Sequence, residues 1–369
     1  MGQEYLSDSC PKTGRGNLPS VVSITYNFQA ESRLHDGARM ALPHIFDQTW
    51  PDPSKLGTDS KSASILLNEA KETFASQLGV RYDEIHFLGE PNLGFHLGIL
   101  GLKQKHLNFK YGATDRMAAF VIASSLAQSQ ELPSDQFGQI DYSTVSNSDL
   151  VAIQLCNRET GVIQENLPTT FGASFIDATA CGTRRALPEN WDVALWDSRS
   201  WMGPAGVGVL AISKKARWKN PLPHLDGKIS PGPASLPLII TSAIAIDSWV
   251  ADEKNLSAKI AEINKQIKTF LASEISQCKV IDGQAPHLIS IIFDGVDSQH
   301  LITRLADLGF AIDAGSACSA ANMKPSHVLA AMGLSTTGNI RLTIHHATTF
   351  EDVSALLSAL KKVVSELRN

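Results

Sequence analysis

Short apolar segments that alternate with helical segments constrain the fold of this chain most strongly. The segment Ala63 to Gly79 carries apolar residues at helical spacing, and the strand-like segment Glu84 to Leu88 follows it. Another helix is expected from Met117 to Gln130, with Thr114 as its cap. This alternation predicts an α/β fold with a mostly parallel sheet flanked by helices. Strands buried on both faces are expected at the short apolar runs Leu150 to Leu155, Ser174 to Ile176, Val193 to Trp196 and Val207 to Ile212.

The pattern changes after Pro231-Gly232-Pro233, where the chain is expected to leave the large domain before it enters a smaller α+β unit. Two long helices are predicted, from Leu236 to Glu253 and from Leu256 to Ser273. Two strands and a closing helix follow, at Leu288 to Phe293, Ile340 to Ile344 and Glu351 to Leu367. A chain of 369 residues suits one large domain plus a smaller one. We therefore expect a large α/β domain at residues 37–245 and a small α+β domain formed by residues 1–36 and 246–369.

The composition is that of an ordinary globular protein of the cytoplasm. The net charge is −5, which gives no electrostatic attraction to nucleic acid or to an anionic membrane surface. The polar N-terminus has no apolar stretch that would act as a signal sequence, and no segment is long and apolar enough to cross a membrane. The 5 cysteines are scattered and show no metal-ligand spacing, so we expect free thiols and no metal site.

The most distinctive motif is AGSACSAANMKPSHVLAAMGL, which spans Ala314 to Leu334 and is followed by the string Asn339-Ile340-Arg341-Leu342-Thr343. These strings, and the order of elements from Pro51 onward, resemble the class V aminotransferase family, specifically the NifS/IscS-type cysteine desulfurases. The resemblance implies fold type I of the pyridoxal phosphate (PLP)-dependent transferases, PLP as the family's cofactor, and a homodimer. It assigns Cys318 as the thiol that receives the substrate sulfur as a persulfide. It assigns Arg341 as the group that holds the substrate carboxylate.

The segment that resembles the cofactor-lysine region departs from the family pattern. The string DVALWDSRSWMGPAG, Asp192 to Gly206, keeps the Gly-Pro-x-Gly turn, but the Schiff-base lysine falls on Ser200. The histidine before it falls on Arg199, and the phosphate-binding serine falls on Asp197. A lysine amine holds PLP and shuttles protons, and a serine does neither. A carboxylate at Asp197 would also repel a phosphate dianion. Covalently bound PLP is therefore not expected.

At the other cofactor-binding positions implied by the resemblance, the residues also differ from the family pattern, with one exception. The family's phosphate-binding turn falls on Glu90, Pro91 and Asn92, where a carboxylate is unfavourable and proline lacks an amide donor. The exception is Asp177, which falls on the aspartate that pairs with the pyridinium nitrogen. Three more positions differ from the family pattern. The ring-stacking histidine falls on Arg116, the asparagine near the ring hydroxyl falls on Arg158, and the glutamine after Asp-Ala-Thr falls on Ala180.

Two interpretations of the three arginines Arg116, Arg158 and Arg199 stay open. If the fold is kept, their guanidinium groups converge near Asp177 and Asp197. The pocket is then either a structural remnant filled by mutual ion pairs or a site for a different anionic ligand.

Two functions follow from these residues. The leading hypothesis is a desulfurase-like protein with degenerate PLP chemistry, acting as a binding, scaffold or sulfur-relay partner through Cys318. Its partner would be an active desulfurase or a sulfur-acceptor protein. The alternative is an active PLP-dependent cysteine desulfurase that forms a persulfide on Cys318. A PLP-independent Cys318 hydrolase or transferase lacks a visible base. Lys214 and Lys215, which follow the strand after the turn, are expected to be solvated.

Overall fold

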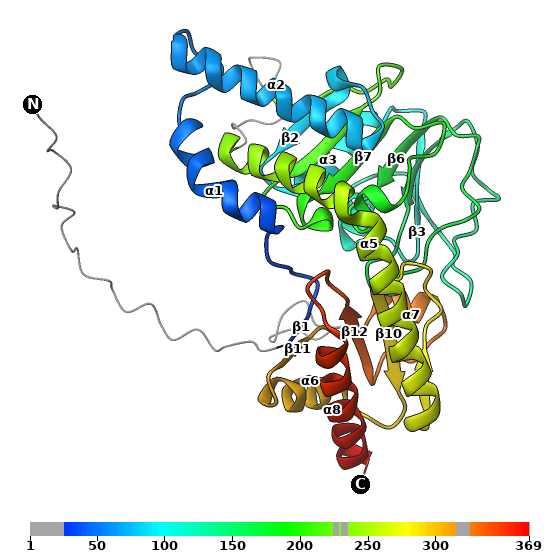
Figure 1. Ribbon diagram of the computed structural model, residues 1–369. Coiled ribbons are helices and arrows are strands. Elements are labelled where there is room, and N and C mark those ends of the chain that lie inside the picture. The colour runs from blue at the N-terminus through cyan, green and yellow to red at the C-terminus, as the bar shows by residue number, and fades with distance from the viewer. Residues whose placement is uncertain (1–25, 224–228, 230–234, 315–324, 369) are drawn as a thin grey trace, which may run out of the picture.

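The computed structural model describes residues 26–223, 229, 235–314 and 325–368. The chain forms two lobes joined by one long helix, α5 (Leu236–Glu274) (Figure 1). The larger lobe is built on a 7-stranded sheet in the order β2-β8-β7-β6-β5-β3-β4. Only β8 runs antiparallel to its neighbours, so the expected mostly parallel sheet is confirmed. Its strands are β2 (Ile85–Leu88), β3 (Asn108–Gly112), β4 (Ser129–Leu132), β5 (Asp149–Gln154), β6 (Ala173–Asp177), β7 (Val193–Asp197) and β8 (Gly208–Ile212).

Helices cover both faces of this sheet because its central strands are apolar on both sides. Trp196 of β7 packs in one core cluster with Phe74 of α2 (Thr58–Leu78) and with α5. The neighbouring Leu195 packs on the opposite face with α3 (Pro91–Leu102) and α4 (Met117–Ser124). Helix α3 approaches the sheet closely at Gly94, where an added Cβ would overlap the Leu195 side chain. Glycine at this position therefore sets the distance between the helix and the sheet.

The smaller lobe carries the C-terminal elements together with the first described strand. β1 (Tyr26–Phe28) pairs in parallel with β11 (Phe310–Ile312), which places Phe28 in the core of this lobe. β10 (Leu288–Phe293) lies between β12 (Asn339–Thr343) and β9 (Cys278–Val280), antiparallel to both. The small lobe also holds the helices α6 (Ser298–Asp307), α7 (His327–Ala331) and α8 (Phe350–Arg368). The large lobe also holds the helix α1 (Asp36–Gln48) and the 3-10 turns η1 (Tyr82–Glu84), η2 (Gly182–Arg184) and η3 (Ser198–Trp201).

Two predicted helices differ from the structure. The two long helices expected on either side of residue 254 are one continuous helix, α5, whose first half packs in the large-lobe core and whose second half packs in the small-lobe core. No glycine or proline interrupts the polar stretch between the two halves, so nothing ends the helix there. The helix expected to reach Gln130 ends at Ser124, because Ser129–Leu132 pairs with β3 as strand β4. Its cap residue is Arg116 rather than Thr114, whose hydroxyl has no partner.

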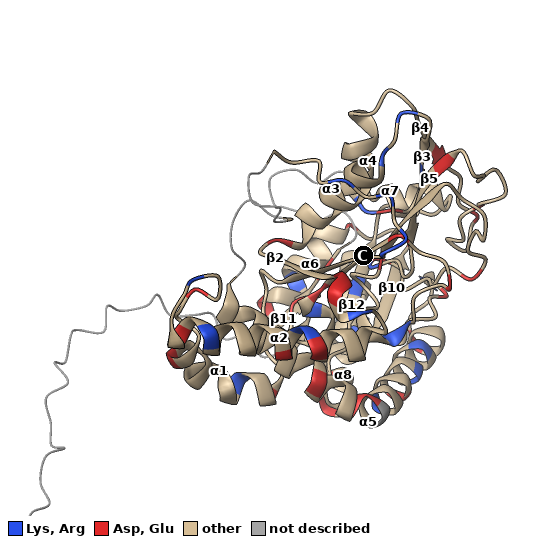
Figure 2. Cartoon of the chain, turned by 90° about the horizontal axis from the view of Figure 1, so that it is seen from above, with Lys and Arg blue, Asp and Glu red and all other residues tan. Residues whose placement is uncertain are grey.

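The charges on the surface are mixed in sign. Basic and acidic residues are interspersed along α2, α5 and α8 (Figure 2). Among the described residues, no helix has the length and hydropathy needed to cross a lipid bilayer.

Candidate functional site

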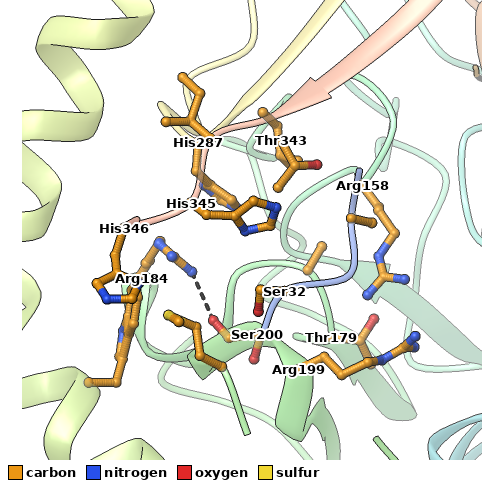
Figure 3. A pocket seen from close by; sticks show the side chains of 16 residues that line it. Ser32, Arg158, Thr179, Arg184, Arg199, Ser200, His287, Thr343, His345 and His346 are labelled. Carbon is orange, nitrogen blue, oxygen red and sulfur yellow. Dashed lines mark hydrogen bonds between the residues drawn. The ribbon is translucent and has the colours of Figure 1, made fainter. Parts of the chain in front are cut away.

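A cavity of about 60 Å³ lies where the strands of the large lobe end against the small lobe (Figure 3). The large lobe contributes Arg158, Thr179 and Ser200, which follow the carboxyl ends of β5, β6 and β7. The small lobe contributes His287, before β10, and Thr343, at the end of β12. Ligands of open α/β sheets bind at this edge, because the carboxyl ends of parallel strands lie side by side there.

The carboxylate of Asp197 is fully committed to Arg199. The guanidinium donates from Nε to both carboxylate oxygens at 3.1 Å and from Nη2 to Oδ2 at 2.7 Å. Asp197 also accepts from the Arg199 amide at 3.0 Å and is only 1 % exposed. This hydrogen-bonded pairing with Asp197 raises the pKa of Arg199. A hydrogen-bonded ion pair of a buried carboxylate and a half-buried guanidinium therefore occupies the position that the resemblance assigns to phosphate binding.

Ser200 is also engaged within its own turn. Its hydroxyl donates to the carbonyl oxygen of Asp197 at 2.7 Å, and its own carbonyl accepts from Nη1 of Arg184 at 3.1 Å. Among the described residues, no lysine lines the cavity. Lys214 and Lys215 are exposed, as expected, and the amine of Lys214 pairs with Asp83 at 3.4 Å.

Arg158 is brought to the cavity as expected, but its pairing is weaker. Its Nη2 lies 3.8 Å from Oδ2 of Asp197, an oxygen that already accepts from Arg199. Burial and then the neighbouring charge of Arg116 lower the pKa of Arg158 to about 10. The structure thus brings together Arg158, Arg199 and Asp197, with one carboxylate between two guanidinium groups.

Arg116 is linked to Asp177 through the hydroxyl of Thr179 and also lies beside Asn92. Its Nη1 donates to the Thr179 hydroxyl at 2.9 Å, and that hydroxyl donates to Oδ1 of Asp177 at 2.6 Å. Its Nη2 lies 3.4 Å from Oδ1 of Asn92, and the guanidinium lies 5.4 Å from the centre of the Phe95 ring. Oδ1 of Asp177 also accepts the Thr179 amide at 2.9 Å. Asp177 is thus tied into the protein by local hydrogen bonds, and its ring-pairing role stays a prediction.

The N-terminus of α3 carries its own acidic cap. The Glu90 side chain accepts from the amide of Asn92 at 2.8 Å, and Pro91 occupies the first turn. An amide that would otherwise be available to a phosphate is therefore already used by a carboxylate.

Of the two residues to which the resemblance assigns a direct role in the reaction, the structure describes Arg341 but not Cys318. Arg341 pairs with Asp313 at 2.7 Å, while its buried Nε has no partner among the residues that the structure describes. Asp313 also accepts from the amide of Ala30 at 2.9 Å, which links the first strand to this site. Cys318 lies outside the described residues. His327 contacts the carbonyl oxygen of Asp115 at 2.8 Å.

The sequence reasoning missed two charged residues of the site, Asp313 and Arg184. Asp313 follows β11 directly, and a charged residue at a strand end next to a predicted active loop would have been the signal. Arg184 is half-buried, and its guanidinium lies 4.4 Å from the centre of the Trp249 ring. The adjacent pair Arg184-Arg185, soon after a buried strand, was the available clue. Within the described ranges, no three His, Cys, Asp or Glu side chains are placed to hold a metal ion.

The comparisons with known proteins point to one family. The model of the family described as aminotransferase class-V matches residues 51–356. A cysteine desulfurase of Azotobacter chroococcum is 22% identical over 373 residues, which cover 95% of this chain and 94% of that protein. The cysteine desulfurase IscS of Methanosarcina thermophila is 23% identical, with 89% of this chain and 88% of that protein covered. A solved structure described as a NifS-like protein superimposes with a TM-score of 0.81 at 18% identity, over 92% of this chain and 99% of its own. This chain belongs to the class V aminotransferase family, is similar to cysteine desulfurases, and has their PLP-dependent transferase fold.

Proposed function

We propose that this chain is a desulfurase-like protein that does not hold PLP covalently and that serves as a sulfur-relay or binding partner. The observation that carries the proposal is the closed Asp197–Arg199 pair beside Ser200. PLP is the cofactor of family members. The resemblance places the lysine that binds PLP at Ser200 and one ligand of its phosphate at Asp197.

The side chains present do not fit the cofactor. No described lysine reaches the cavity, so no amine is available there for a Schiff base. Asp197 is already paired with Arg199 and Glu90 caps the adjacent helix, so neither position offers a donor to the phosphate group of the cofactor.

A relay through Cys318 needs no lysine. In this step the Cys318 thiolate attacks the terminal sulfur of a persulfide on a donor protein. A new S–S bond forms on Cys318, the donor's S–S bond breaks, and its electron pair leaves with the donor thiolate. The donor would be an active desulfurase, and the product persulfide would pass to an acceptor protein in the same way.

We also propose that the protein forms a homodimer, as the resemblance implies. Large apolar side chains on and near α1 support a partner surface, because Met40 and Trp50 are 78% and 74% exposed. Light scattering on the eluted protein should give twice the chain mass of 39.8 kDa. A monomer mass at micromolar concentration would contradict the dimer.

The test of the proposed function is a relay assay with an active desulfurase. The desulfurase, free cysteine and this protein are incubated together, and persulfide is measured on Cys318 by mass spectrometry, with Cys318→Ala as the control. We expect persulfide only in the wild type and only when the desulfurase is present. Persulfide and sulfide formed from cysteine and PLP without the desulfurase would instead favour the alternative, an active enzyme.

A further inference from the structure

The cavity is lined by two guanidinium groups, Arg158 and Arg184, that donate no hydrogen bond to a carboxylate of the described residues. Among the described residues, no carboxylate oxygen lies within 4.0 Å of Arg184. Its Nη1 donates to the carbonyl of Ser200, and its face lies over Trp249. Burial lowers the pKa of Arg184 and the charge of Glu253 opposes that shift, but a guanidinium stays protonated near neutral pH.

Arg158 supplies the second positive charge. The nearest carboxylate, that of Asp197, lies 3.8 Å away and already receives three side-chain hydrogen bonds from Arg199. The lowered pKa of Arg158, caused by burial and by Arg116, is the expected result of a cation that is poorly compensated. The walls of the cavity therefore carry an excess of positive charge.

Two buried polar atoms beside these cations have no partner among the described residues. Within that part of the chain, the hydroxyl of Thr343 and Nδ1 of His287 make no hydrogen bond, and the two residues are only 6% and 7% exposed. Both residues line the cavity (Figure 3). Buried polar groups are rarely left unpaired, because each costs the desolvation of that group. The pair therefore indicates a missing partner inside the cavity.

The protonation state of His287 determines whether the missing partner must donate or accept a hydrogen bond there. Burial, followed by the charge of Arg184, lowers the pKa of His287 well below its ordinary value, so the ring is neutral. The ring hydrogen-bonds to the backbone of Ala180. Because that backbone group is a carbonyl that raises the pKa, the ring nitrogen facing it carries the proton, and Nδ1 is left as an acceptor. Nδ1 therefore requires a hydrogen from the ligand, whereas Thr343 and the arginines donate to it.

We propose that this cavity binds a small oxyanion that carries a proton, of the hydrogen phosphate type, between Arg158 and Arg184. Thr343 donates to one oxygen of the ion, and the hydroxyl of the ion donates to Nδ1 of His287. A phosphate ester has lost its last hydroxyl proton near pH 7, so a site that needs this proton favours the free ion over an ester. The inference does not depend on sulfur transfer or on Cys318.

The test is calorimetric titration of the full-length protein, freed of phosphate by dialysis, with inorganic phosphate at constant ionic strength. Arg158→Asn and Arg184→Met should each weaken phosphate binding by about tenfold or more, since each removes a charged hydrogen-bond donor. Arg39→Gln, which alters an exposed pair with Asp36, is the matched control and should bind as the wild type does. Thr343→Val keeps the shape of the side chain and tests the site without disturbing the Arg184–Trp249 contact.

Three further titrations separate the ligand classes and the two proposals. Sulfate has the same shape but almost no bound proton near pH 7, so it should bind more weakly than phosphate. Glycerol 3-phosphate should bind more weakly than the free ion. Cys318→Ala should bind phosphate normally, so a failed relay assay leaves this site intact. Sulfate binding as tight as phosphate binding would overturn the proton-bearing class, and a phosphate signal equal to that of sodium chloride would overturn the site.

Discussion

At the scale of single residues, the chemistry of the site depends on Asp197, because a buried carboxylate is stable there only while a cation pairs with it. Asp197→Asn removes that charge and leaves Arg199 and Arg158 facing each other. We expect the free energy of unfolding to fall by about 1–3 kcal/mol, the range for leaving a buried polar group unsatisfied. Arg199 is 31% exposed, which keeps the loss below that of a fully buried pair.

The matched control is Glu366→Gln. The Glu366–Arg304 pair has the same 2.7 Å length as Asp197–Arg199, but both side chains are exposed. Its removal should change the free energy of unfolding by less than about 1 kcal/mol. Urea titration of both variants checks the difference. Equal losses in the two variants would mean that the Asp197 pair is an ordinary surface contact.

The cysteines give a second prediction at the residue scale. Burial raises the pKa of Cys156 to about 12 and also raises the pKa of Cys181, so both thiols stay protonated and inaccessible near pH 8. A relay thiol must be accessible and partly ionised. We therefore expect iodoacetamide to label Cys318 at least about tenfold faster than Cys156 or Cys181 in the folded protein. Equally slow labelling of all three, followed by peptide mass spectrometry, would remove the basis for the relay.

At the scale of elements, α4 begins beside a buried acid. Burial raises the pKa of Asp115 to about 8, and only its Oδ2 accepts a hydrogen bond, from the amide of Gly112 at 2.9 Å. The folded state therefore binds a proton that the unfolded state releases near pH 4. Between about pH 4 and pH 8 the stability contributed by this group falls as the pH rises.

Asp115→Asn should remove this loss of stability with rising pH. The amide oxygen of asparagine still accepts the hydrogen bond from Gly112, and the side chain carries no charge at any pH in this range. We expect thermal midpoints of the wild type to drop relative to those of the variant as the pH rises from 5 to 8. Differential scanning calorimetry at several pH values measures the difference. A difference that stays constant with pH would show that Asp115 is ionised in the folded state.

The sequence predicted the central strands well and the helix ends poorly, for physical reasons. β5, β6 and β7 are continuous apolar runs, and burial on both faces leaves few alternatives for such segments. Ser129–Leu132 is polar and mostly exposed, so its strand character comes from pairing with β3 rather than from its own pattern. The length of α5 comes from the two cores that it joins, which local sequence does not encode.

At the scale of the whole molecule, the site exists only because two lobes meet. The sequence predicted that Arg158, Arg199 and Asp197 converge, because the resemblance fixes the ends of neighbouring strands. It did not predict Asp313 as the partner of Arg341, or Arg184 over Trp249, because these contacts join segments far apart in the chain. The pairing of each guanidinium with a carboxylate depends on distances in the folded protein. The spacing of these residues along the sequence does not give those distances.

The most direct test of the central claim is reduction of the protein with borohydride in the presence of PLP, followed by measurement of the intact mass. Borohydride fixes a Schiff base as a stable pyridoxyl adduct on the lysine that formed it. Because the resemblance places Ser200 at the position of that lysine and no described lysine lines the cavity, we expect the unmodified mass, with an active cysteine desulfurase as the positive control. A stoichiometric adduct, mapped by peptide analysis to one lysine of this chain, would contradict the account.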